Sequence, residues 1–99
     1  MRVISRKILR NFCESHADSC DALYDWYRVS SQAEWLSLID VQQIYTKSEV
    51  VGNFTVFNIK GNRYRLIVNL VDVSQKIYIK YVLTHAEYDK DEWKNHPYF

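Results

Sequence analysis

The spacing of apolar residues changes at Gly52-Asn53, from a helical period to a period of two. Before that point no glycine or proline interrupts residues 1–51, as long helices prefer. After it, apolar and polar residues alternate through residues 54–83, the period of strands with two different faces. A chain of 99 residues has room for one hydrophobic core. We therefore expect a single domain over residues 1–99 with an α+β fold, in which N-terminal helices pack on a sheet.

The first half of the chain predicts a short opening strand over residues 2–4, followed by helices. Trp26 and Trp35 occupy apolar helical positions, which favours a place in the core or an interface over a ligand site. Polar residues that can cap helices precede the apolar stripes. The predicted starts are Ser5 for a helix from Arg6, Asp18 or Ser19 for a second helix, Ser30 or Ser31 for a third, shorter stretch, and Asp40 for a further turn.

The second half predicts three antiparallel strands, over residues 54–60, 63–71 and 76–83. Gly61-Asn62 suits a tight hairpin turn, because both residues tolerate positive φ, and residues 72–75 make the next connection. The helices should cover one face of this small sheet and leave the other partly open. Strand alternation places Arg63 and Arg65 on the open side, and by the same rule Lys60 and Lys80 join them.

This basic, partly aromatic face suits a polyanion such as RNA, because cations contact phosphates and aromatic rings stack on bases. The formal net charge is only +1, but residues 55–82 carry five basic residues against Asp72 alone. The positive potential is thus confined to one part of the molecule. An ordinary solvated sheet face is the simpler alternative for these charges.

Residues 84–90 follow the third predicted strand directly, and there His85 and Tyr88 could act as acid and base. A plain surface turn is the alternative. Cys13 and Cys20 are expected to be reduced thiols, because no signal peptide is recognisable. Together with His16 they would make three zinc ligands, but a fourth is missing, so we expect no metal. No apolar run is long enough to cross a membrane, and we expect a cytoplasmic protein.

Two segments resemble one known family. Asn58-Ile-Lys-Gly-Asn-Arg-Tyr-Arg-Leu-Ile67 and Thr84-His-Ala-Glu-Tyr-Asp-Lys90, in this order and separated by one strand, are similar to HigB-type toxins of the RelE-like superfamily. The opening residues 1–7 and Asp25-Trp-Tyr27 resemble the same family. The resemblance implies the RelE-like microbial RNase fold and a bacterial type II toxin–antitoxin system. It also implies an endoribonuclease that cuts mRNA on the ribosome without a cofactor, and a HigA-like helix-turn-helix antitoxin as partner.

On this resemblance the ribose 2′-OH attacks the adjacent phosphate. Arg65 would stabilise the phosphate charge, and His85 and Tyr88 would be the acid and base, in an order that the sequence leaves open. The expected RNA-binding residues are Lys60, Arg63, Lys80 and Lys90. Two other functions stay open: a binding module without catalysis, and a degenerate toxin that only binds its antitoxin.

Overall fold

The computed structural model describes residues 1–99 as a five-stranded sheet with helices packed against it. The strands are β1 (Arg2–Ile4), β2 (Glu49–Val51), β3 (Phe54–Ile59), β4 (Tyr64–Val71) and β5 (Lys76–Thr84). The α-helices are α1 (Arg6–Ser15), α2 (Cys20–Gln32), α3 (Leu38–Gln42) and α4 (His85–Asp89), and two 3₁₀ turns, η1 (Ala17–Ser19) and η2 (Glu92–Asn95), complete the fold. None of these helices has the length and apolar character needed to cross a membrane.

The sheet has the order β1-β5-β4-β3-β2. The predicted meander of β3, β4 and β5 is confirmed, with Ile59 opposite Tyr64 across the first hairpin and Tyr64 opposite Thr84 in the next strand pair. The predicted opening strand is also confirmed: β1 lies parallel to β5, with Arg2 opposite Lys76. β2 was not predicted, because residues 49–51 precede Gly52-Asn53, where the sheet pattern was expected to begin. It pairs with β3 through a two-residue turn at Gly52-Asn53.

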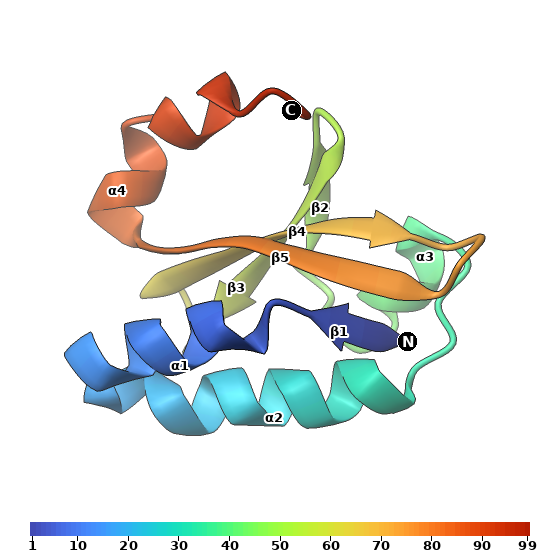
Figure 1. Cartoon of the computed structure of the whole chain (residues 1–99), viewed down its shortest axis with the longest axis horizontal. Coiled ribbons are helices and arrows are strands. Elements are labelled where there is room, and N and C mark those ends of the chain that lie inside the picture. The colour runs from blue at the N-terminus through green and yellow to red at the C-terminus, as the bar shows by residue number, and fades with distance from the viewer.

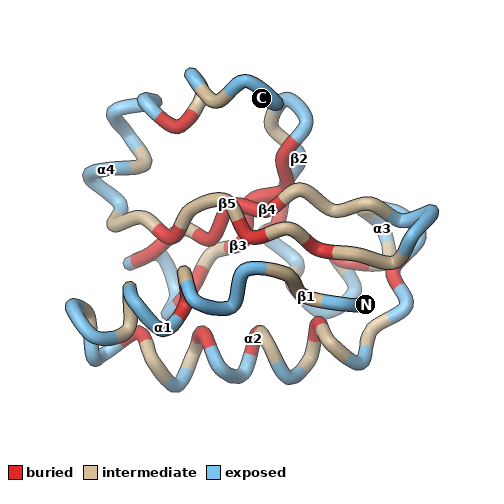
Figure 2. The backbone as a smooth tube through the Cα atoms, viewed as in Figure 1, coloured by how far each residue is buried: buried red, intermediate tan, exposed pale blue.

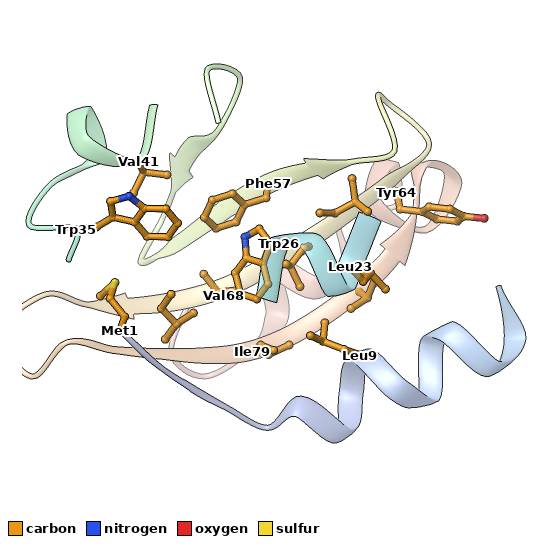
Figure 3. Packing of buried hydrophobic residues seen from close by; sticks show 14 residues of the cluster. Met1, Leu9, Leu23, Trp26, Trp35, Val41, Phe57, Tyr64, Val68 and Ile79 are labelled. Atoms are coloured by element: carbon orange, nitrogen blue, oxygen red, sulfur yellow. The ribbon is translucent and has the colours of Figure 1, made fainter. Parts of the chain in front are cut away.

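The main hydrophobic core lies between the sheet and the pair α1 and α2, which run along one side of it (Figure 1). Leu9 of α1 and Leu23 and Trp26 of α2 are buried against the sheet. The Trp26 ring meets the Phe57 ring of β3 edge to face, with their centroids 5.4 Å apart (Figure 3). The helical stripes read from the sequence therefore face the core, and the predicted α+β layering is confirmed.

The predicted third helix from Ser30 or Ser31 is wrong, because α2 continues through Gln32 and the chain is then extended. This extended stretch buries Trp35 beside Phe57, at a centroid distance of 6.2 Å. α3 follows, and its cap is Ser37 rather than Asp40: the Ser37 side chain accepts a hydrogen bond from the Asp40 main-chain nitrogen.

The second face of the sheet is covered rather than open. The segment after β5, with α4 and η2, turns back over it (Figures 1 and 2). Trp93 of η2 is 3% exposed and forms a second small core with Phe54, Val56 and Ile67. The face that was expected to be partly open is therefore less open than alternation indicated, because the aromatic C-terminal segment packs on its apolar residues.

Strand alternation was misread along β5 because this strand contains a bulge. Ile67 pairs with Tyr81 while Val68 pairs with Ile79, so Lys80 has no partner in β4. The extra residue reverses the alternation after Lys80. Tyr81 thus joins the second face and Val82 the main core, whereas unbroken alternation from Ile77 would place each on the other face.

Candidate active site

Two of the proposed catalytic residues, Arg65 and Tyr88, meet where β4 begins and β5 ends, and His85 is the first residue of the short helix that carries Tyr88. Antiparallel pairing sets Tyr64 opposite Thr84 and Arg65 opposite Leu83, so His85 follows directly beside the β3–β4 hairpin. The His85 main-chain nitrogen donates a hydrogen bond of 3.1 Å to the Arg63 carbonyl oxygen. The two sequence blocks singled out above therefore adjoin in space.

Arg65 is half-buried on the second face of the sheet and held by its neighbours. Its Nη1 donates to the Asn62 carbonyl oxygen at 3.1 Å, and its Nη2 donates to Asn62 Oδ1. The guanidinium carbon lies 5.2 Å from the centre of the Tyr88 ring. This cation–π contact places the charge beside the phenol, in reach of an anion that approaches either group.

α4 has only five residues, but its start is well defined. Thr84 Oγ1 accepts from the Glu87 main-chain nitrogen at 3.2 Å, and Glu87 Oε1 accepts from the Thr84 main-chain nitrogen at 2.9 Å. The hydrogen bond from the Thr84 backbone is the main reason why the pKa of Glu87 is lowered. The two bonds form a capping box, which fixes the direction in which α4 leaves the sheet.

His85 is oriented by a carboxylate on its own helix. Its Nδ1 lies 2.8 Å from Asp89 Oδ2, one turn further on, and its side chain is 46% exposed. Nε2 has no protein partner and remains available to a ligand. A carboxylate on one ring nitrogen and a free second nitrogen is the arrangement that general acid–base histidines use.

Tyr88 is the third residue of this corner. Its ring stacks on Trp93, with centroids 5.2 Å apart and planes 16° apart, and its hydroxyl lies 3.5 Å from Glu49 Oε1 of β2. Burial raises the pKa of the Tyr88 phenol, and the charge of Glu49 adds to the effect. The phenol therefore stays protonated near neutral pH, as a proton donor must be.

Lys60 and Arg63 do not share a face with Arg65, contrary to the prediction. Arg63 Nη1 lies 2.7 Å from Asp18 Oδ2, and Lys60 Nζ donates to the Asp18 carbonyl oxygen at 3.1 Å. Both residues belong to the hairpin connection, outside β3 and β4, so strand alternation does not govern them. They turn toward η1 on the helical side of the sheet.

The two remaining predicted RNA-binding lysines lie apart from this corner. The Nζ of Lys80 is 5.7 Å from the Tyr78 ring and 5.6 Å from the Tyr98 ring, toward the other end of β5. Lys90 follows α4 and lines a cavity of about 220 Å³ with Tyr81 and Trp93, among others. The predicted patch is thus divided among three places.

The cysteines are bonded to each other, so the expectation of two reduced thiols is wrong. Cys13 near the end of α1 and Cys20 at the start of α2 form a disulfide, with their Cα atoms 5.0 Å apart. The tight connection through η1 brings them within disulfide distance. No cluster of three His, Cys, Asp or Glu side chains is arranged to hold a metal ion.

Sequence reasoning missed four polar residues that contact the predicted ones: Asp18, Glu49, Asn62 and Asp89. Asp89 carried a readable signal, since it stands four residues after His85 on a helix. Asp18 and Glu49 reach the site only through tertiary packing, and no local spacing indicates them.

Comparisons with known proteins agree with the resemblance seen in the sequence. Residues 19–91 match the model of a family described as HigB_toxin, RelE-like toxic component of a toxin-antitoxin system. A protein from Escherichia coli O6:H1 named mRNA interferase HigB is 25% identical over 96 residues, which cover 91% of this chain and 90% of that protein. The mRNA interferase toxin HigB of E. coli K12 is 50% identical over 34 residues, about a third of each protein (34% and 33%).

Proposed function

This chain belongs to the HigB family of RelE-like toxins, the toxic components of toxin–antitoxin systems, and we propose on that basis that it is an endoribonuclease that cuts mRNA on the ribosome. One observation supports this function best: Arg65 contacts Tyr88 of α4, and His85 is the first residue of the same helix. That corner offers a cation, an imidazole beside a carboxylate and a protonated phenol. These are the groups that cleavage of a phosphodiester requires.

The reaction starts with the 2′-hydroxyl of one ribose. His85 accepts its proton through Nε2, and the 2′-oxygen attacks the adjacent phosphorus. The bond from phosphorus to the 5′-oxygen of the next nucleotide then breaks, and that oxygen takes a proton from Tyr88. The products are a 2′,3′-cyclic phosphate and a 5′-hydroxyl end, and this scheme uses no metal or other cofactor.

Arg65 stabilises the charge that develops on the phosphate during this attack. Its hydrogen bonds to Asn62 orient the guanidinium before RNA arrives, so little reorganisation is needed. Asp89 holds the His85 ring and supports the positive charge that the ring gains as base. The raised pKa of Tyr88 favours the role of acid for this residue.

Family membership implies an antitoxin as partner, and we propose a HigA-like protein with a helix-turn-helix domain. We further propose that residues 1–99 act as a single domain in the cytoplasm, where translating ribosomes supply the mRNA. Lys60, Arg63, Lys80 and Lys90 are proposed to contact RNA from three different parts of the surface.

The function is tested by mapping RNA 5′ ends in bacteria after brief expression of the wild type, Arg65→Ala, His85→Ala and Lys7→Ala. Lys7 is an exposed cation of α1 that makes no ion pair or hydrogen bond, so its variant is the control. We expect new 5′-hydroxyl ends inside translated frames for the wild type and Lys7→Ala only.

Other outcomes point to other functions. If new 5′ ends also form with His85→Ala, the protein is still a nuclease, but His85 is not essential for cleavage. RNA binding without new ends would indicate a binding module. A folded protein that binds only its antitoxin would be a degenerate toxin.

A further inference from the structure

The Asp18 carboxylate is held by three groups from the β3–β4 hairpin region. Its Oδ1 accepts a hydrogen bond of 2.6 Å from the Tyr64 hydroxyl. Its Oδ2 lies 2.7 Å from Arg63 Nη1 and 3.5 Å from Lys60 Nζ. Two cations and one hydroxyl thus surround a single oxyanion.

These donors form the kind of site that phosphate oxygens occupy. Arginine, lysine and hydroxyl side chains supply many of the contacts that proteins make to phosphates, and the phosphate resembles a carboxylate in charge and acceptor geometry. The site is open to solvent: the side chains of Asp18, Lys60 and Arg63 are 35%, 44% and 62% exposed. A phosphodiester can therefore reach the two cations that Asp18 contacts, whereas Tyr64 is 5% exposed and lies at the inner end of the site.

The site also lies next to the proposed catalytic corner. Arg63 is two residues before Arg65, and its carbonyl oxygen accepts the hydrogen bond from the His85 main-chain nitrogen. A phosphate bound by Lys60 and Arg63 would lie on the helical side of the hairpin, and the phosphate that Arg65 contacts would lie on the other side. A single RNA strand that passes the edge of the hairpin can reach both places.

A histidine beside this site has an unused polar atom. The His16 ring stacks on Phe12 at 4.1 Å and lies 5.6 Å from the Tyr64 ring, and its Nδ1 is buried without a hydrogen-bond partner.

Asp18 itself belongs to η1, which connects α1 to α2, and the Cys13–Cys20 disulfide closes this connection. The position of the carboxylate is therefore set by the helical half of the chain, while its partners belong to the sheet.

We propose that Lys60, Arg63 and Tyr64 form a binding site for a backbone phosphate of RNA, and that the Asp18 carboxylate competes with RNA for this site. The inference rests on the proposed function for its ligand, and it adds an internal competitor that limits RNA affinity. Removal of the Asp18 charge should accordingly tighten RNA binding, because Lys60 and Arg63 become available to phosphates.

The test compares Asp18→Asn with Asp21→Asn. Asparagine at position 18 keeps the shape of the side chain and one acceptor oxygen, which can serve Tyr64 or Arg63 but not both. Asp21 is an exposed residue of α2 without an ion pair or hydrogen bond. Both variants lose one negative charge, so a general charge effect is equal in the two. The probe is a fluorescent single-stranded RNA whose 2′-hydroxyls are methylated, so that it binds but cannot be cut.

We expect Asp18→Asn to bind this RNA about three- to tenfold more tightly than Asp21→Asn. The plot of log affinity against log salt should also become steeper, by about 0.7 for each cation that gains a phosphate contact. The double variant Asp18→Asn/Arg63→Gln should lose most of the gain. Thermal unfolding curves would show that each variant is folded.

Equal or weaker binding by Asp18→Asn relative to Asp21→Asn would overturn the inference and leave the proposed nuclease intact. Failure of the wild type and all variants to bind the RNA would overturn the inference alone, because the proposed nuclease acts on mRNA that the ribosome holds. The expected affinities without any cleavage of unmodified mRNA would support the phosphate site and contradict the nuclease.

Discussion

The main-chain nitrogen of His85 donates a hydrogen bond to the carbonyl oxygen of Arg63, at 3.1 Å. This bond continues the β4–β5 ladder by one step beyond the pair of Tyr64 and Thr84. The first residue of α4 is therefore positioned by the sheet register. A helix of five residues has little stability of its own, so this anchor and the capping box keep its side chains in place.

Tyr88→Phe should reduce RNA cleavage by about 10²–10⁴-fold, because the ring stack on Trp93 remains and only the proton donor is lost. Tyr81→Phe is the matched control, since Tyr81 packs on the same second core and its hydroxyl makes no hydrogen bond. The measurement is the single-turnover cleavage rate on ribosome-bound mRNA. Equal cleavage rates for the two variants would show that Tyr88 is not the proton donor.

Thr84→Ala should cost about 1 kcal/mol of unfolding free energy, because the cap of α4 is lost. It should also slow cleavage, since His85 and Tyr88 leave their positions. Ser37→Ala removes the corresponding cap of α3. That variant should lose comparable stability and keep full activity. Urea unfolding and cleavage assays on both variants separate the two effects, and an active Thr84→Ala protein would argue against the role of the cap.

Gly52→Ala should destabilise the protein more than Gly61→Ala. Both glycines have positive φ, 60° and 66°, so each alanine costs about 1–2 kcal/mol of backbone strain. A Cβ at Gly61 meets nothing within 4 Å, whereas one at Gly52 would lie 2.6 Å from the main-chain oxygen of Phe99. The difference in unfolding free energy therefore measures the packing of the C-terminal segment. Equal losses would show that this segment does not depend on Gly52.

Asp18 should make the stability of the protein depend on acid pH. The hydrogen bond from Tyr64, with the charges of Lys60 and Arg63, lowers the pKa of Asp18 from its usual 3.8. Its contribution is therefore present above about pH 4 and is lost as the pH falls through the lowered pKa. Melting curves between pH 2 and 7 should show the wild type and Asp18→Asn converging at low pH. A constant difference would contradict the ion pair.

The double variant Cys13→Ser/Cys20→Ser should lose about 2–3 kcal/mol of stability, as expected when a short loop is no longer closed by a disulfide. Its melting temperature should equal that of the reduced wild type. Alkylation of native protein prepared without reductant checks the bond directly. Two freely reactive thiols would show that it does not form.

The sequence predicted what depends on local periodicity. The alternation in residues 54–83 identified β3, β4 and β5 within one residue at either end, and the stripe around Leu9 and Leu23 gave the core face of the helices. The two blocks that contain Arg65 and His85 also gave the family and the corner of the sheet where they meet.

Features that depend on distant contacts were not predictable in this way. The residue types of β5 do not indicate the bulge at Lys80, although the bulge moves each later side chain of the strand to the opposite face of the sheet. Trp93 covers the second face because of its tertiary packing on Phe54, which local periodicity does not indicate. For the same reason the pairing of Asp18 with Arg63 could not be foreseen.

The parallel pairing of Arg2 with Lys76 has a consequence for synthesis. The first strand of the chain completes the sheet only after the last one has been made, and residues 84–90 follow later still. The corner that carries Arg65, His85 and Tyr88 can therefore form only after residues 84–90 have been made. On the proposed function, a nascent chain that ends before α4 has no cleavage activity.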